Sequence, residues 1–192
     1  MRVTTHRELV YQVLGVRCEV VARRLPRVEA LMLATCSCLI GGDQRFCYRA
    51  AAVILDRGRV LLQEDTLAEP FWVLPGGRME HGESGWECIA REMREELEED
   101  VAVERLLWFV ENFFEHQGMK WHEVGLYFLV SLAEGSRFLG GGPHWGVETE
   151  IDLTFRLEWH DVEKLDGVRL LPSFLRERLR RLPAQIEYVV SP

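Results

Sequence analysis

The stretch from Gly77 to Glu99, GRMEHGESGWECIAREMREELEE, constrains the fold of this chain more than any other segment. Four of its glutamates are spaced to share one face of a helix: Glu92, Glu95, Glu96 and Glu99. Like charges at i and i+4 repel, so such a stripe weakens a helix unless a cation neutralises it. The spacing therefore predicts a helix that carries a metal site.

The composition suits one domain with a sizeable core. The chain has 192 residues, of which 47% are hydrophobic, and its formal net charge is −8. This acidic balance argues against general nucleic-acid binding, because proteins that bind a phosphate backbone are usually basic. No apolar run is long enough to span a bilayer, so we expect no membrane partner. An acidic protein that handles phosphates needs local positive charge, most simply a divalent metal ion.

Cysteine usage indicates a reducing compartment. The five cysteines are an odd number, and their spacing does not match a disulfide framework. The pair Cys36 and Cys38 lacks a second Cys or His pair at zinc spacing. The start of the chain is also a poor match to a secretory signal. We therefore expect a cytoplasmic protein, and the sequence leaves open whether it is a monomer or a homodimer.

The first 42 residues differ from the rest of the chain. They are rich in arginine, show broken helical periodicity and lead into Gly41-Gly42-Asp43, which is typical of a linker. We expect residues 1–42 to be a loosely attached N-terminal extension and residues 43–192 to form the domain. An amphipathic helix that binds a membrane or a partner is the alternative for the extension.

Strand and helix signals alternate through the rest of the chain. We expect strands at 49–55, 59–63, 71–74, 106–114, 119–130 and 151–159, with a turn at 56–58. A glycine-rich loop is expected at 135–146 and helical segments at 161–165 and 172–182. Strands interleaved with helices predict an α/β fold with a mixed sheet and helices packed on it.

The central helix has a clear start and a clear apolar face. Ser84 and Glu87 have the spacing of a capping box, which favours a helix beginning there. Five residues recur at helical spacing and are expected to form the buried face, with the acids opposite: Trp86, Ile89, Ala90, Met93 and Leu97.

The glycine loop and this helix together carry a family resemblance. The pattern Gly77-x5-Glu83-x7-Arg91-Glu92-Met93-x-Glu95-Glu96 resembles the signature of the Nudix hydrolases, which cleave nucleoside diphosphates linked to another group. Residues 46–182 also follow that family's order of elements. The resemblance implies an α/β/α sandwich and a loop–helix–loop metal site. It also implies an enzyme that needs Mg²⁺ or Mn²⁺ to cleave a pyrophosphate bond in a nucleotide.

One position departs from the pattern. Glu98 stands where the box usually has a glycine that ends the helix, and Glu99 where an aliphatic residue is usual. Glycine adopts a positive φ there without steric cost. Glu98 must therefore take that conformation at a cost, or the helix must run on.

The acids of the box are the expected metal ligands. Glu92, Glu95 and Glu96 offer hard carboxylate oxygens suited to Mg²⁺ or Mn²⁺. The glycine pair allows close backbone approach, and the resemblance also implies that the carbonyl of Gly76 completes the metal shell.

Two further residues are expected to support the loop. Arg91 and Glu83 are expected to pair and to fix the loop, including Gly77, onto the helix. If the acids Glu92, Glu95 and Glu96 are considered without the loop, the alternative to a metal site is an ordinary solvent-exposed helix face.

The general base is expected among Glu95, Glu148 and Glu150. The last two follow the long loop and resemble family acids that act as a base or as an additional metal ligand. An ordinary acidic loop is their alternative. His122, beside Glu123, is a weaker candidate, because a lone histidine is more often packed or exposed than catalytic.

Substrate contacts are expected from both aromatic and basic residues. Trp72 and Phe114 are candidates for stacking on a base, although aromatics in strands more often belong to the core. Arg49 and Arg78 are candidates for phosphate contacts.

Two alternatives to a hydrolase are a nucleotide-binding sensor without catalysis and a prenyl diphosphate isomerase. The isomerase would need a cysteine and a glutamate at its site.

Overall fold

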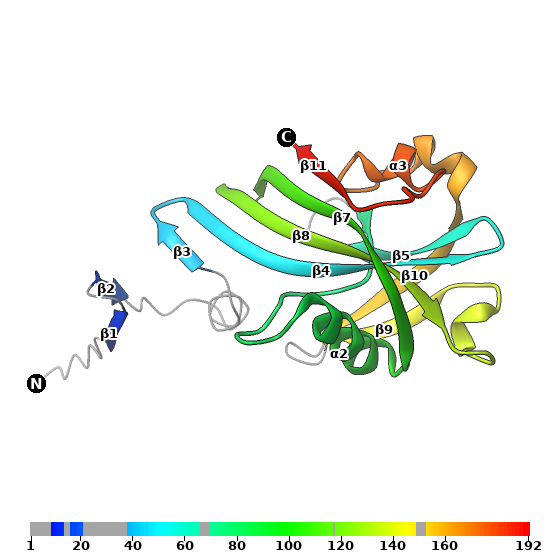
Figure 1. Ribbon diagram of the computed structural model, residues 1–192, viewed down its shortest axis with the longest axis horizontal. Coiled ribbons are helices and arrows are strands. Elements are labelled where there is room, and N and C mark those ends of the chain that lie inside the picture. Colours follow the sequence, from blue (N-terminus) through cyan, green and yellow to red (C-terminus); the bar gives the residue numbers. More distant parts are fainter. Residues whose placement is uncertain (1–8, 14–15, 21–37, 66–69, 117, 149–152) are drawn as a thin grey trace, which may run out of the picture.

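A computed structural model of the protein describes residues 9–13, 16–20, 38–65, 70–116, 118–148 and 153–192 (Figure 1). Its strands are β1 (Leu9–Val13), β2 (Val16–Val20), β3 (Cys38–Gly41), β4 (Gln44–Asp56), β5 (Arg59–Asp65), β6 (Phe71–Val73), β7 (Val101–His116), β8 (Met119–Leu132), β9 (His144–Glu148), β10 (Leu153–Asp161) and β11 (Glu187–Ser191). Its helices are α2 (Gly85–Leu97) and α3 (Leu175–Arg178), with 3-10 turns η1 (Arg137–Leu139) and η2 (Val162–Gly167). None of the helices described is long and apolar enough to cross a membrane.

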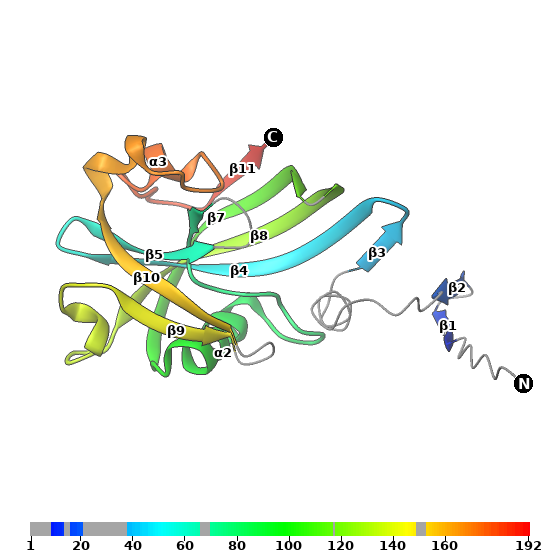
Figure 2. The same cartoon turned by 180° about the vertical axis from the view of Figure 1, so that it is seen from behind.

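A mixed sheet organises the domain. Its strands follow the order β11-β7-β8-β4-β5-β10-β9, with β3 added to β4 and β6 to β5. The β4–β8 and β11–β7 pairs are parallel and the other pairs are antiparallel. Helix α2 covers one face, while η2 and α3 lie over the other (Figures 1 and 2). The expected α/β/α sandwich with a mixed sheet is therefore confirmed.

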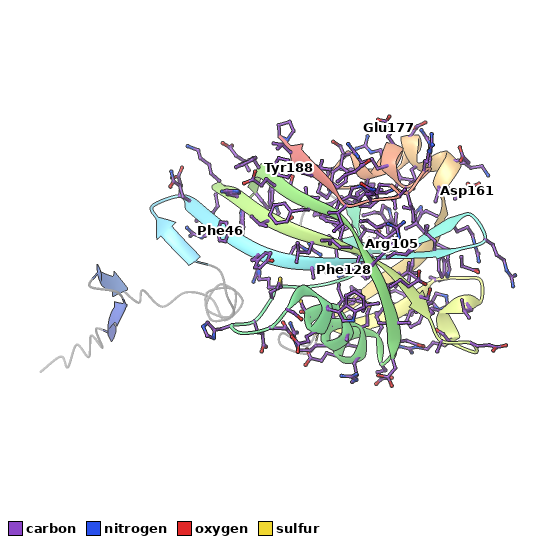
Figure 3. All side chains as sticks on the ribbon, in the orientation of Figure 1. Phe46, Arg105, Phe128, Asp161, Glu177 and Tyr188 are labelled. Carbon is purple, nitrogen blue, oxygen red and sulfur yellow. The ribbon has the colours of Figure 1, made fainter. Side chains whose placement is uncertain are left out.

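Alternation along β4 builds a core on each face of the sheet. Ala50, Ala52 and Ile54 join the cluster under α2, whereas Ala51 and Val53 join the cluster under η2 and α3. Side chains fill both layers (Figure 3). Because the central strands are buried on both sides, the sheet is a rigid base for the loops at its edges.

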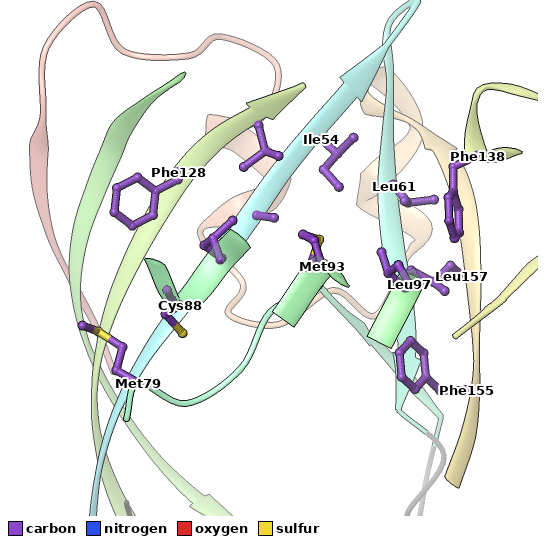
Figure 4. Packing of buried hydrophobic residues seen from close by; sticks show 14 residues of the cluster. Ile54, Leu61, Met79, Cys88, Met93, Leu97, Phe128, Phe138, Phe155 and Leu157 are labelled. Carbon is purple, nitrogen blue, oxygen red and sulfur yellow. The ribbon is translucent and has the colours of Figure 1, made fainter. Parts of the chain in front are cut away.

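Helix α2 begins where its capping box predicted. The Ser84 side chain accepts a hydrogen bond from the N–H of Glu87, and the Glu87 carboxylate accepts one from the N–H of Ser84 at 2.9 Å. Ile89, Met93 and Leu97 are fully buried against the sheet (Figure 4). Burial of a side chain of this size contributes about 1.5–3 kcal/mol, so this face holds the helix in place.

Two expectations for this helix were wrong. Trp86 is 47% exposed and only touches the ring of Phe128 edge-on. Glu92 and Glu96 do not lie on a solvent face opposite the core, because they are 8% and 6% exposed. They sit beside the apolar stripe, and Gly77 of the preceding loop lies directly against the carboxylate of Glu92.

The helix ends at the anomalous glutamate. Glu98 adopts the left-handed conformation, with φ 55° and ψ 34°, and its N–H donates to the carbonyl of Arg94 at 3.2 Å. Arg137 donates to the carbonyl of Leu97 at 2.9 Å, which satisfies a terminal acceptor and brings positive charge to the negative end of the helix. Of the two expected outcomes, the chain takes the strained one.

Several boundaries differ from the expected ones. The turn at 56–58 is correct, with Arg57 and Gly58 at positive φ in a two-residue hairpin. The linker at 41–43 was wrong, because β3 pairs antiparallel with the start of β4 and Gly42 lies in the turn between them. The loop at 135–146 is interrupted by η1, where Phe138 is fully buried.

The C-terminal part also differs. The helix expected at 172–182 is only four residues long, because after Leu179 the chain forms tighter i to i+3 turns before Pro183. Strand β11 was not expected at all. Its Val189 is 7% exposed and pairs with Val110, so the strand is stabilised by a contact with β7 that is distant in sequence.

Candidate active site

The loop before α2 runs along the edge of β4. The N–H of Ala50 donates to the carbonyl of Gly77 at 2.9 Å, and the N–H of Met79 donates to the carbonyl of Tyr48 at 3.0 Å. The N–H of Ala52 also donates to the carbonyl of Pro75 at 2.8 Å, so backbone pairing fixes the chain on both sides of the glycine pair.

Both glycines are required by close contacts. Gly76 has φ 134°, and a Cβ there would lie 2.3 Å from the carbonyl oxygen of Ala50. A Cβ on Gly77 would lie 2.1 Å from Oε1 of Glu92. The carboxylate of Glu92 thus occupies the space that any other residue at position 77 would fill.

Arg91 joins the loop to the helix. Its guanidinium makes two hydrogen bonds to Glu83, at 2.8 and 2.9 Å, and donates to the carbonyl of Arg78 at 2.9 Å. It also reaches Glu92 at 2.8 Å and Glu95 at 3.1 Å. The hydrogen bonds to Glu83 and the neighbouring carboxylates raise the pKa of Arg91, while Arg91 lowers the pKa of Glu83.

The acids of α2 fit a hard divalent cation by their chemistry. Glu92 and Glu96 are buried one turn apart, and the side chain of Glu95 is half exposed. All three offer the oxygen donors that Mg²⁺ and Mn²⁺ prefer, and the Glu92 carboxylate lies directly against the backbone of Gly77. Within the described ranges, no three His, Cys, Asp or Glu side chains converge as a ready metal site. Arg91 already binds Glu92 and Glu95, so a cation would share these carboxylates with it.

A second group of polar residues lies on the sheet beside this loop. We call it the polar cluster, and it consists of Cys47 and Arg49 on β4, Arg78 on the loop, Asn112 on β7 and Glu123 on β8. Arg49 donates to the carbonyl of Gly76 at 3.2 Å, and the backbone of Arg49 pairs with Arg78. Register places Cys47 opposite Glu123, and Glu123 opposite Asn112.

Electrostatics connects the polar cluster to the acids of the helix. Burial by itself would lower the pKa of Arg49, but the charges of Glu123, and also of Glu92, raise it overall. Burial and Glu123 raise the pKa of the Cys47 thiol, against Arg78 and Arg49. Arg49 therefore lies within the electrostatic reach of both the helix acids and Glu123.

The family model of the NUDIX domain matches residues 46–182 of this chain. The chain belongs to the Nudix family. A Nudix hydrolase cleaves phosphorus-containing acid anhydrides, and the loop, the paired Glu83 and Arg91, and the acids of α2 lie inside the matched segment. Family membership also implies a divalent metal ion and a small nucleotide-type substrate.

Several solved Nudix structures are similar to this chain. The MutT protein from Bacillus halodurans is 17% identical, with 76% of this chain and 91% of that chain covered and a TM-score of 0.49. An ADP-ribose pyrophosphatase from Streptococcus suis is 18% identical over 76% and 98%, with a TM-score of 0.47. A MutT Nudix hydrolase from Burkholderia pseudomallei is 26% identical over 61% and 84%, with a TM-score of 0.42.

The expected base residues lie at the edge of what the structure describes. Glu148 is the last residue of β9, and its side chain and the whole of Glu150 fall outside the described residues. Strand β9 itself packs on α2, which we call the Nudix helix, since a Cβ on Gly146 would lie 2.9 Å from Leu97.

The expected substrate contacts divide into two groups. Arg49, Arg78 and Phe114 lie on or beside the polar cluster, and Phe114 is 37% exposed. Trp72 is elsewhere, on β6, where it packs edge-on against His160. His122 lies on the opposite sheet face from Glu123, because neighbouring residues of a strand point to opposite sides.

The polar residues Asn112 and Glu123 gained their importance from the structure. In sequence they are ordinary members of two strands, and only their burial, at 9% and 8% exposed, sets them apart. Neither Cys47 nor Cys88 offers a reactive thiolate, because burial raises the pKa of both thiols, that of Cys88 to about 12.

Proposed function

We propose that this Nudix hydrolase cleaves the pyrophosphate bond of a nucleoside diphosphate derivative or a nucleoside di- or triphosphate, using Mg²⁺ or Mn²⁺. The observation that carries the proposal is the contact between Gly77 and Glu92. A buried carboxylate held against a bare backbone, with Glu95 and Glu96 beside it, is an arrangement with hard oxygen donors that suits a phosphate-bound cation.

In the proposed mechanism, Glu92, Glu95, Glu96 and the carbonyl of Gly76 would hold the cation. A cation bound there supplies charge neutralisation on the phosphates and a water of lowered pKa. Arg91 keeps the carboxylates in position through its bonds to Glu92 and Glu95.

The remaining chemistry needs a base and phosphate contacts. Glu95 and Glu148 are the proposed bases, with Glu150 as a further candidate. The packing of β9 on α2 supports Glu148, because it brings the end of that strand to the Nudix helix. Arg78 and Arg49, beside the loop, are the proposed phosphate contacts.

The test is a substrate panel with Mg²⁺ or Mn²⁺ that includes nucleotide sugars, ADP-ribose, nucleoside di- and triphosphates and dinucleotides. Glu92→Gln and Glu96→Gln are expected to remove nearly all metal-dependent hydrolysis while the protein stays folded. Glu134→Gln, an exposed acid in a turn, is the matched control and should keep full activity. An intact panel would refute the hydrolase. Tight binding without turnover would favour the sensor, and turnover without phosphate-bond cleavage the isomerase.

We also propose a cytoplasmic location. Two buried cysteines of the described residues, Cys47 and Cys88, are free thiols, which supports a reducing compartment. Fractionation of cells that produce the protein would test this.

A further inference from the structure

We propose that Glu123, with Asn112 beside it, recognises the base of the substrate nucleotide and selects guanine. This inference rests on the proposed function, because it takes the substrate to be a nucleotide whose phosphates lie at the Nudix helix. It adds the identity of the base and the residues that read it.

Glu123 and Asn112 are buried polar residues that belong to neither of the two apolar core clusters. They are 8% and 9% exposed, and farther along the same face Trp108 and Tyr127 continue as ordinary core. From the described part of the chain, the Glu123 carboxylate receives one hydrogen bond, a long one of 3.4 Å from the Asn112 amide. The charge of Glu123 is balanced by the nearby Arg49, but with so few donors its two oxygens keep capacity to accept hydrogen bonds from a ligand.

The pair lies at the right place to meet a nucleotide. Register sets Cys47 opposite Glu123, and Arg49 follows two residues along β4 on the same face. Arg49 in turn donates to the carbonyl of Gly76, the proposed metal ligand, at 3.2 Å. A ligand whose phosphates bind at the Gly76–Gly77 loop can therefore extend past Arg49 towards Glu123, along the side of the sheet on which both residues lie.

An aromatic pair continues the same face. Phe114 and Trp121 lie two residues beyond Asn112 and Glu123 on their strands, and their rings are parallel within 2° with centroids 5.9 Å apart. Phe114 is 37% exposed, and the indole N–H of Trp121 is buried with no partner among the described residues. Stacking on an aromatic ring favours nucleotide binding whatever the base, because every base has a π-face.

The chemistry of the pair favours guanine. A carboxylate has two acceptor oxygens and no donor, whereas an amide has both a donor and an acceptor. Guanine presents two adjacent N–H donors, at N1 and N2, beside the acceptor O6. The carboxylate of Glu123 can accept both N–H groups, and the amide of Asn112 can donate to O6. Adenine presents an acceptor at N1, which a carboxylate repels.

Binding of mononucleotides to the full-length protein without metal tests this directly. Ligand-observed NMR should give the order GMP, then IMP, which lacks the N2 amino group, then AMP. We expect GMP to bind about tenfold or more tightly than AMP, as for other bidentate base contacts. Glu123→Gln should weaken GMP about tenfold without weakening AMP, because an amide presents a donor to the N–H groups of guanine and removes the charge that repels N1 of adenine.

Two further variants keep the result interpretable. Glu115→Gln changes an exposed acid of β7 on the other sheet face and should leave all three affinities unchanged. Phe114→Ala should weaken all three nucleotides together and keep their order, because stacking does not distinguish bases by their edges. Circular dichroism and melting curves establish that each variant is folded.

The outcomes separate this inference from the proposed function. Equal affinity for GMP and AMP, no binding of either, or an unchanged preference in folded Glu123→Gln would each overturn the inference. Metal-dependent hydrolysis of several nucleotides could still stand in those cases. Conversely, selective GMP binding by a protein that hydrolyses nothing would support Glu123 as the base reader and refute the hydrolase.

Discussion

Gly77 and Glu92 are so close that a Cβ at position 77 would lie 2.1 Å from the carboxylate. The glycine therefore contributes space for a side chain from the next element, in addition to backbone freedom. This contact couples the loop to the helix, so a substitution at either residue should change the position of the other.

Replacement Gly77→Ala should displace the Glu92 carboxylate and lower kcat about 100-fold, because a misplacement of about 1 Å has an effect of that size. The fold should survive, since the backbone pairing between Ala50 and residue 77 can persist. Hydrolysis rates and melting curves measure the two effects. Gly141→Ala is the control, because a Cβ there meets nothing within 4 Å. Full activity in Gly77→Ala would contradict the role given to Glu92.

The ion pair between Glu83 and Arg91 should make stability depend on acid pH. Arg91 lowers the pKa of Glu83 in the folded protein below its usual value of 4.5. The pair therefore stabilises the fold above that value, and this contribution is lost as the pH falls below 4.5 through the folded pKa.

Urea unfolding at a series of pH values checks this dependence. The wild-type free energy of unfolding should fall more steeply between about pH 5 and pH 3 than that of Glu83→Gln. At pH 7 the variant should be the less stable of the two, because the guanidinium of Arg91 loses a charged partner. Parallel curves for the two proteins would show that Glu83 does not couple to folding.

The helix end offers a stabilising substitution. Glu98 holds φ 55°, which costs a residue with a Cβ about 1–2 kcal/mol. Glu98→Gly should remove that cost and one negative charge from the helix C-terminus, raising the Tm by about 2–8 °C for a chain of this size. Hydrolysis should be unchanged, because Glu98 lies outside the proposed metal ligands. Glu99→Gly, one residue on, should give no such gain, and an equal gain there would contradict strain at Glu98.

Removal of residues 1–37 tests the domain boundary. Strand β3 and all the described residues of the two core clusters would remain, and the family match begins only at residue 46. The shortened protein should therefore keep its Tm and its hydrolytic rate. A large loss of either would show that the N-terminal extension is integral to the domain.

The sequence predicted those features of the fold that depend on short-range pattern. The capping box at Ser84 and the turn at Arg57 were correct because local hydrogen bonding and backbone preference decide them. Strand β11 could not be predicted, since its stability comes from parallel pairing with β7, about eighty residues earlier. Trp86 was assigned to the core from helical spacing alone, but in the fold it meets the ring of Phe128 edge-on and stays 47% exposed.

The sequence by itself determined the family, because the identities and spacing of Gly77, Glu83, Arg91 and the acids of α2 carry a chemical pattern that needs no coordinates. Only the tertiary structure decided which charges are buried and what they meet. Glu92 is enclosed because the loop folds back along β4, and Glu123 becomes a candidate for base recognition because register brings it beside Asn112 and near Arg49. Burial and proximity arise from contacts between distant segments, and no local pattern encodes them.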